Sequence, residues 1–104
     1  MDKFNGIIEV TAAVDLRGIL RYIGETLKEP EAAKRIYFSI KDKINTLDQL
    51  PQRQPFVRDE VLASRGVRRL PVENYSVFYV VDESARKVSI LRILHNRREW
   101  QNII

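Results

Sequence analysis

The chain has 104 residues, no cysteine and one histidine, and its 18 lysine and arginine residues outnumber its 14 acidic residues. We expect residues 1–104 to form a single domain. The composition excludes disulfides, thiolate chemistry, cysteine-ligated zinc and histidine-based metal sites. No apolar run is long enough for a membrane-spanning helix or a secretory signal, so the sequence predicts a small, basic, cytoplasmic domain.

The N-terminal third predicts a strand followed by a long helix. Residues 7–10 form a short β-rich apolar run, and Thr11 is a typical N-cap residue for the following helix. Asp15 falls in the early helix, where a negative charge favours the helix dipole. We expect this helix to end near residues 28–29, because Pro30 disfavours α geometry in the residue before it. Its apolar face consists of Ala12, Leu16, Ile19, Leu20, Ile23 and Leu27.

Pro30 opens a second predicted helix, with Glu31 in its first turn. The apolar positions of this helix repeat the same spacing and are Ala33, Ile36, Tyr37, Ile40, Ile44 and Leu47. Two amphipathic helices joined by so short a turn form an antiparallel hairpin. The two prolines within residues 50–55 end the helical region. The apolar stripes of both helices must cover another element, and a sheet is the obvious candidate.

Three strands are predicted in the C-terminal half, whereas residues 56–66 show no clear pattern. Residues 67–72 form the first strand, in which Pro71 favours an edge position or a bulge. Residues 75–81 and 88–94, joined by a polar turn, form two further strands that are apolar on both faces, which is typical of central strands. In the earlier of these, one face carries Tyr75, Val77, Tyr79 and Val81 and the other carries Ser76, Phe78 and Val80.

The predicted order is β-α-α-β-β-β. This is an α+β fold in which an N-terminal strand and a helical hairpin precede a three-stranded antiparallel meander, with the helices on one face of a small twisted sheet. The helices can cover only one face of strands that are apolar on both. We therefore expect the second face to be covered by the C-terminal tail with Trp100 or by a partner chain.

The positive charge lies in the C-terminal half of the chain. Residues 53–98 carry ten basic side chains against five acidic ones, a net charge of +5, and the rest of the chain carries −1. Nine of those ten basic residues are arginine, whose planar guanidinium matches phosphate and carboxylate groups. This pattern is compatible with a solvated surface and with a binding surface for a polyanion or an acidic partner.

Few side chains offer catalytic chemistry. The sequence has no Gly-rich phosphate loop and no nucleophile elbow, and we expect no metal and no cofactor. Arg68 and Arg97 could converge near one sheet edge and hold a phosphodiester, stabilising the charge of its transition state. Because arginine cannot act as a base, His95 is the only candidate for acid–base work near neutral pH. The alternatives are a structural role for His95 and ion pairing for the arginines.

Four aromatic side chains near these residues allow two interpretations. They could stack on nucleic-acid bases, or they could pack in the core, which the alternating pattern of the strand favours. These residues are Tyr75, Phe78, Tyr79 and Trp100.

Seven segments of the chain form a series that spans nearly its whole length. They are residues 12–16 (AAVDL), 22–23 (YI), 30–33 (PEAA), 47–51 (LDQLP), 66–70 (GVRRL), 74–79 (NYSVFY) and 90–100 (ILRILHNRREW). Together and in this order they resemble the RelE/ParE superfamily, the toxins of bacterial type II toxin–antitoxin modules. The resemblance implies a helical hairpin packed on a small antiparallel sheet, and a small antitoxin that wraps the toxin in a hetero-oligomer.

Activity divides within this superfamily, and the resemblance implies different roles for the same positions. RelE-like members cut mRNA on the ribosome, using arginines at positions that match Arg68 and Arg97. They also use upstream lysines or a C-terminal histidine or tyrosine, which residues 59–61 and 102–104 of this chain lack. ParE-like members poison DNA gyrase and need a shaped binding surface instead of a base and an acid.

The sequence therefore predicts a toxin of the ParE-like branch that inhibits growth by poisoning DNA gyrase and is neutralised by a cognate antitoxin. The alternatives are a ribosome-dependent mRNA endonuclease with Arg68, Arg97 and His95 as catalytic residues, an inactive member that binds only its antitoxin, and a basic nucleic-acid-binding domain. The candidate residues for binding the target or the antitoxin are Arg69, Tyr79, Arg92, Arg98 and Trp100.

Overall fold

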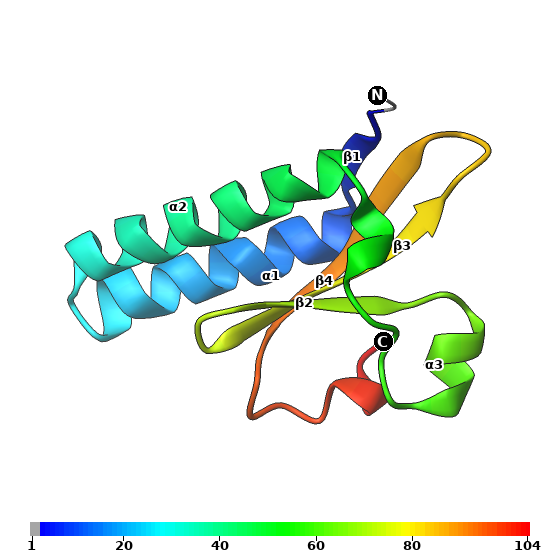
Figure 1. Cartoon of the computed structure of the whole chain (residues 1–104). Coiled ribbons are helices and arrows are strands. Elements are labelled where there is room, and N and C mark those ends of the chain that lie inside the picture. Colours follow the sequence, from blue (N-terminus) through cyan, green and yellow to red (C-terminus); the bar gives the residue numbers. More distant parts are fainter. Residues whose placement is uncertain (1–2) are drawn as a thin grey trace.

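A computed structural model describes residues 3–104 and arranges the chain around one four-stranded sheet (Figure 1). Its strands lie in the order β1-β4-β3-β2, so that β3 and β4 are central as predicted. A long helical hairpin packs on one face, and a short helix and the C-terminal segment lie on the other. In chain order the main elements are β1 (Asn5–Ile8), α1 (Val10–Arg21), a π-helical turn (Tyr22–Thr26), α2 (Pro30–Asn45), α3 (Glu60–Ser64), β2 (Arg68–Val72), β3 (Tyr75–Asp82) and β4 (Lys87–His95). Short 3-10 turns lie at Thr46–Asp48, Pro51–Arg53 and Trp100–Asn102.

The predicted helical hairpin is confirmed. Pro30 is the first residue of α2, where its missing N–H costs nothing and its fixed φ suits the helix. Helix α1 continues through the π-helical turn, and the helical path stops at Lys28, whose φ is 56°. The predicted end near residues 28–29 is thus correct, although nothing in the periodicity indicated the wider turn that precedes it.

Strand β1 begins and ends two residues earlier than predicted, and it pairs in parallel with β4 from Asn5 opposite Lys87 to Ile8 opposite Ile90. The other two pairings are antiparallel, as expected for the meander. Pro71 lies on β2, which is an edge strand, as predicted. Proline has no N–H, and at an edge this removes no hydrogen bond between the central strands.

The sheet has a core on each face. The larger core lies under the hairpin and contains the buried side chains of Ala12, Ile36 and Ile40 from the helices. The predicted alternation in β3 is confirmed, because Val77 and Tyr79 lie in this core and Phe78 lies in the core of the opposite face. Burial on both faces explains why the β3 sequence is apolar at consecutive positions.

The second face is covered by two parts of this chain. Trp100 packs on Phe78 with 5.0 Å between the ring centroids, which confirms the predicted role of the C-terminal tail. The other part comes from the segment that the sequence left unassigned: Val57 and Leu62 are buried against the sheet. Val67 is buried with them; it was predicted as the first residue of the strand, which begins at Arg68 instead. Helix α3 in that segment is too short for a periodicity signal, and its only sequence sign is Asp59, whose carboxylate accepts a hydrogen bond from the N–H of Leu62 at 3.0 Å.

Helix α1 takes over the edge of β4 where β1 ends. Beyond Ile90 no strand from residues 3–104 pairs with this edge, and the hydroxyl of Thr11 donates to the carbonyl of Leu91 at 2.8 Å. Asp15 accepts a hydrogen bond from the N–H of Ile93 at 3.0 Å and pairs through both of its oxygens with Arg92, each at 2.7 Å. Helix α1 begins at Val10 with Glu9 as its N-cap residue, so Thr11 lies inside the helix and Asp15 lies beyond its first turn. The predictions that Thr11 caps the helix and that Asp15 acts on its dipole are therefore wrong, and both side chains bind β4 instead.

A bulge makes this arrangement possible. Phe78 pairs with Arg92 and Tyr79 with Ile90, so Leu91 is an extra residue in β4. After the bulge the alternation of β4 shifts by one, and Ile93 joins Ile90 and Val88 in the core under the hairpin.

No helix within residues 3–104 is long and apolar enough to cross a membrane.

We predict that Asp15→Ala lowers the free energy of unfolding by about 3 kcal/mol, because it leaves a partly buried guanidinium and a strand N–H without their partner. Urea unfolding at neutral pH measures this change. The matched control is Glu25→Ala, which breaks the exposed Arg21–Glu25 pair, whose side chains are 73% and 76% accessible. Its effect stays below about 0.5 kcal/mol. Equal effects of the two substitutions would contradict the central role of the Asp15–Arg92 pair.

Candidate functional site

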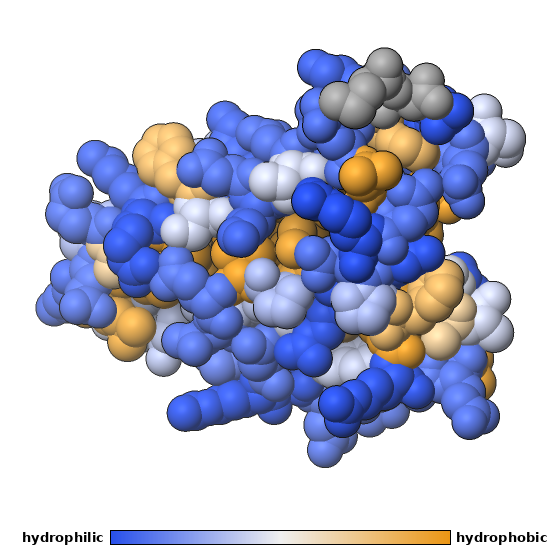
Figure 2. All heavy atoms as spheres, viewed as in Figure 1, coloured by the Kyte–Doolittle hydropathy of each residue, from blue (hydrophilic) through white to orange (hydrophobic). Residues whose placement is uncertain are grey.

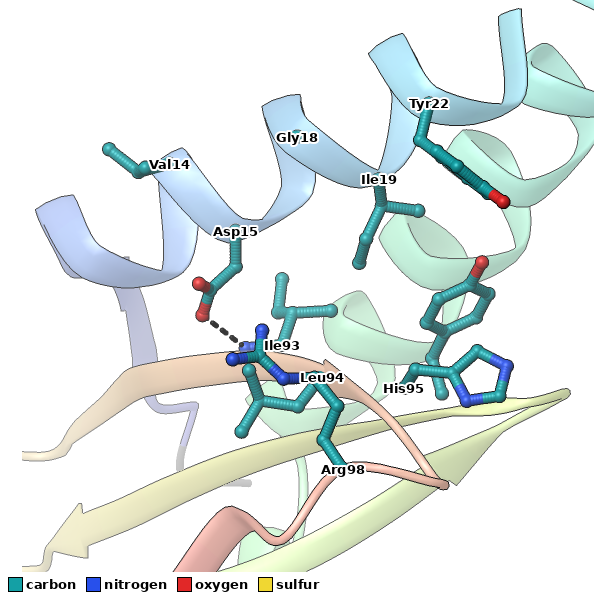
Figure 3. Close-up of a pocket in the computed structure, with 10 residues that line it drawn as sticks. Val14, Asp15, Gly18, Ile19, Tyr22, Ile93, Leu94, His95 and Arg98 are labelled. Carbon is teal, nitrogen blue, oxygen red and sulfur yellow. Dashed lines mark hydrogen bonds between the residues drawn. The ribbon is translucent and has the colours of Figure 1, made fainter. Parts of the chain in front are cut away.

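A pocket of about 400 Å³ opens between α1 and the end of β4 (Figure 3). Figure 3 shows Val14 and Asp15 at one end of it and Tyr22 and His95 at the other. Its walls are mostly apolar, with polar groups at the rim, a combination typical of sites that bind part of another molecule. The lining residues are Val14, Asp15, Gly18, Ile19, Tyr22, Tyr75, Ile93, Leu94, His95 and Arg98.

His95 lies at the end of β4, beside the aromatic rim of this pocket. Its ring meets that of Tyr75 edge to face, with 5.3 Å between the centroids. Its Nδ1 accepts a hydrogen bond from the backbone N–H of Arg97 at 3.1 Å, so in this arrangement the ring proton is on Nε2. To act as a general base through Nδ1, His95 would have to give up this bond.

Burial raises the pKa of the Tyr75 hydroxyl, and the charges of Glu73 and Tyr22 add to that effect.

Arg68 holds the loop that precedes α3. Its Nη1 donates to the carbonyls of Gln52 at 3.0 Å and Gln54 at 2.6 Å, and its guanidinium lies 4.0 Å from the centroid of the Phe56 ring. We call residues 50–57 the connector loop. Since Arg68 is directly opposite Tyr79 in the sheet, the two side chains reach the loop from neighbouring strands.

The hydroxyl of Tyr79 donates to the carbonyl of Pro51 at 2.6 Å, and the side chain is fully buried. Burial raises the pKa of Tyr79 to about 12, although the nearby charges of Arg68 and Arg53 act in the opposite direction. Tyr79 therefore has no exposed surface to offer a partner, and it supports the connector loop from the core.

The structure does not bring Arg68 and Arg97 together, which corrects the expectation that they converge. Arg68 pairs with Tyr79 at one end of β2, whereas Val72 at the other end pairs with Tyr75, which is opposite His95. Four strand positions separate these ends, roughly 13 Å. Arg97 lies in the turn after β4, which Figure 1 shows at the other end of the sheet from the start of β2.

Two of the other candidate arginines are occupied by partners within the fold. Arg92 pairs with Asp15, and the carboxylate that accepts its hydrogen bonds raises the pKa of Arg92. The Nε of Arg69 donates to the hydroxyl of Ser76 at 2.7 Å, and this hydroxyl donates to the side-chain oxygen of Asn96 at 2.6 Å. The Arg92–Asp15 pair connects β4 to α1, and the hydrogen bonds of Ser76 connect β2 and β3 to the turn after β4.

The remaining candidates lie at the surface or near it. Arg97 and Arg98 are exposed in the turn after β4, and Arg98 reaches the rim of the pocket. Trp100 is half-buried over Phe78 and also lines a second pocket, beside the connector loop. Neither the place of Tyr22 in the pocket nor the contact of Arg68 with the connector loop follows from periodicity, so the sequence did not predict them. Within residues 3–104 no group of three histidine, cysteine or acidic side chains could hold a metal ion.

Comparisons with known proteins agree with this fold. Residues 7–100 match the family model described as "ParE toxin of type II toxin-antitoxin system, parDE". A structure of the chromosomal ParDE system from P. aeruginosa is similar with a TM-score of 0.74 and 26% sequence identity, covering 91% of this chain and 98% of that chain. The toxin–antitoxin complex RelBE2 from Mycobacterium tuberculosis is similar in fold, with a TM-score of 0.64, 21% identity and coverage of 91% and 93%. No curated protein matches the sequence.

We predict that Tyr79→Phe lowers the free energy of unfolding by about 1–2 kcal/mol at neutral pH, because the buried carbonyl of Pro51 loses its donor. The pKa of Tyr79 is about 12 in the folded protein and about 10 in an unfolded chain. Its neutral hydroxyl therefore contributes its full stability below pH about 10, and this contribution is lost as the pH rises towards 12. Urea unfolding between pH 7 and 11 should show a smaller difference between the two proteins at the alkaline end.

The matched control is Tyr22→Phe, since Tyr22 is 56% exposed. Its unfolding midpoint at neutral pH stays unchanged. A Tyr79→Phe protein as stable as the original at every pH would contradict the role of Tyr79 as a support of the connector loop.

Proposed function

The chain belongs to the family of ParE toxins of type II toxin–antitoxin systems, and we propose that it inhibits growth by binding and poisoning DNA gyrase. It acts in the cytoplasm, without a cofactor, until a cognate antitoxin neutralises it. The observation that carries this proposal is the position of Arg68, which is bound to loop carbonyls at the end of the sheet remote from His95 and Arg97.

Chemical requirements favour poisoning over RNA cleavage. Cleavage through the 2′-hydroxyl needs a base, an acid and stabilisation of the charged transition state. Here the only histidine has its Nδ1 in a hydrogen bond with the Arg97 N–H, and the two candidate arginines lie apart. Poisoning a topoisomerase requires only a surface that binds the enzyme, and the exposed arginines and apolar side chains of this fold can form one.

A cognate antitoxin is the second partner in this proposal. Two solved structures similar to this chain are described as a toxin–antitoxin system and a toxin–antitoxin complex. The pocket between α1 and β4 suits a segment of such a protein, because Ile19 and Ile93 provide apolar contacts and Arg98 provides a cation for an acidic side chain.

One observation favours the alternative of a ribosome-dependent mRNA endonuclease. His95, Arg97 and Arg98 lie within four residues at the end of β4, so a base and two cations could face one phosphate there. In this alternative, Arg68 takes no part in the cleavage.

We predict that the purified protein, free of antitoxin, produces linear DNA from a relaxed plasmid in a supercoiling reaction with DNA gyrase and ATP. The product should require gyrase, and it should also form with His95→Gln, since a binding surface needs no base. A reaction without gyrase is the control for nuclease activity in the preparation.

The endonuclease alternative predicts the opposite pattern. There the protein has no effect on gyrase and cuts mRNA on ribosomes, and His95→Gln reduces this cleavage by about 10²-fold or more. A folded protein that has neither activity and does not slow growth when expressed without antitoxin would be an inactive member of the family, and the proposal would be wrong.

A further inference from the structure

The connector loop is held rigidly from beneath by the sheet. Tyr79 binds the carbonyl of Pro51 and Arg68 binds those of Gln52 and Gln54. The backbone N–H of Arg69 donates to the carbonyl of Pro55 at 3.3 Å. Four carbonyls of this loop thus have donors from β2 and β3. Such a loop presents its outward side chains in a fixed geometry, which lowers the entropy lost when it binds a partner.

Leu50 at the start of this loop combines strain with exposure. Its φ is 49°, in the left-handed region that leucine rarely adopts, and its side chain is 66% exposed. Asparagine or glycine would adopt this conformation more easily. A leucine that is strained and mostly in water adds little to stability. Strained backbone of this kind concentrates at functional sites.

Further apolar side chains are exposed near Leu50 in the chain. Phe56 of the same loop is 50% exposed, and Val61 on α3, to which the loop leads, is 60% exposed. Figure 2 shows apolar side chains gathered at the surface over α3 and the start of β2, bordered by hydrophilic ones. Exposed apolar groups with a polar border are typical of surfaces that bind other proteins.

The same stretch of the chain is strongly positive. Residues 50–69 contain five arginines and two acidic residues, a net charge of +3 within a chain whose total is +4. Arg53, Arg58 and Arg65 are exposed and form no ion pair within the part of the chain that the structure describes. A pocket of about 260 Å³ beside Phe56 is lined by Arg58 and Trp100, among others.

We propose that this region is the surface with which the toxin binds its target protein, and that the target offers acidic side chains around an apolar patch. We call it the connector surface; it consists of Leu50, Arg53, Phe56, Arg58, Val61 and Arg65. Exposed leucine and valine have no use in binding a phosphate backbone, whereas aromatic side chains and arginine are enriched in protein interfaces. This inference rests on the function proposed above, in which the target is DNA gyrase.

Two substitutions test the connector surface. Leu50→Asn removes an exposed apolar side chain and relieves the left-handed strain, so the unfolding midpoint should stay the same or rise. Arg58→Glu reverses an exposed charge at a side chain that has no hydrogen bond or ion pair with another residue among 3–104. Each should raise the protein concentration needed for half-maximal gyrase-dependent linear DNA at least about tenfold, as expected for residues central to an interface. Each should also reduce growth arrest on expression without antitoxin.

The matched controls lie on α2. Phe38→Gln replaces an apolar side chain that is 55% exposed, and Lys34→Glu reverses an exposed charge. Both should act on gyrase and on growth as the original protein does.

The third readout, for the original protein and all variants, is binding to a short DNA duplex measured by fluorescence anisotropy.

The outcomes separate this inference from the proposed function. If the original protein poisons gyrase and both connector variants do so equally well, the connector surface is wrong and the function stands. If the original protein arrests growth without affecting gyrase, the choice of gyrase is wrong; reduced arrest by the connector variants then still supports the surface, and unchanged arrest overturns it. Variants that lose only duplex binding would overturn it in favour of nucleic acid, and a protein without any effect would overturn both.

Discussion

The fold depends on which groups form hydrogen bonds with the backbone along the outer edge of β4. Strand β4 has nine residues and β1 only four, so in the described part of the chain more than half of this edge has no neighbouring strand. An uncovered central strand would expose unpaired backbone groups. Helix α1 supplies the missing partners through Thr11 and Asp15, and Arg92 extends the connection to the C-terminal segment by donating to the carbonyl of Ile103 at 3.4 Å. These contacts with the edge of β4 fix the position of the hairpin and of the pocket beneath α1. Through Arg92 they also reach the C-terminal segment, which covers the second face of the sheet.

A similar constraint explains why a candidate catalytic arginine serves the fold. The connector loop pairs with β2 through an isolated antiparallel bridge between Phe56 and Arg68, and its carbonyls before that bridge need other donors. Arg68 and Tyr79 are cross-strand neighbours whose long side chains reach that loop. A guanidinium that donates to two carbonyls and lies over an aromatic ring is not available to clamp a phosphate. Sequence position alone cannot distinguish these roles, because both require an arginine at the start of β2.

Hydrophobic periodicity was sufficient to predict the hairpin, the central strands and the two apolar faces of β3, because each depends on a pattern repeated over several turns or residues. It failed where a single contact between distant segments decides the structure. Thr11 and Asp15 have the sequence signature of a helix start, yet they bind β4 about 80 residues later in the chain. The bulge at Leu91, the π-helical turn and the five-residue α3 are likewise set by packing between segments. For the same reason the prediction that Arg68 and Arg97 converge was wrong, because the distance between them depends on strand register.

The two candidate surfaces lie at opposite ends of the meander. The pocket beneath α1 is at the end that contains Tyr75 and His95, and the connector loop is at the end that contains Arg68 and Tyr79. A partner in the pocket therefore does not cover the connector loop directly. The C-terminal segment touches both regions, since Arg98 lines the pocket and Trp100 lines the cavity beside Phe56. An antitoxin that blocks target binding from the pocket must therefore either extend along the sheet or act on this segment, and the contacts of Trp100 with Phe78 make the segment part of the folded core rather than a loose tail.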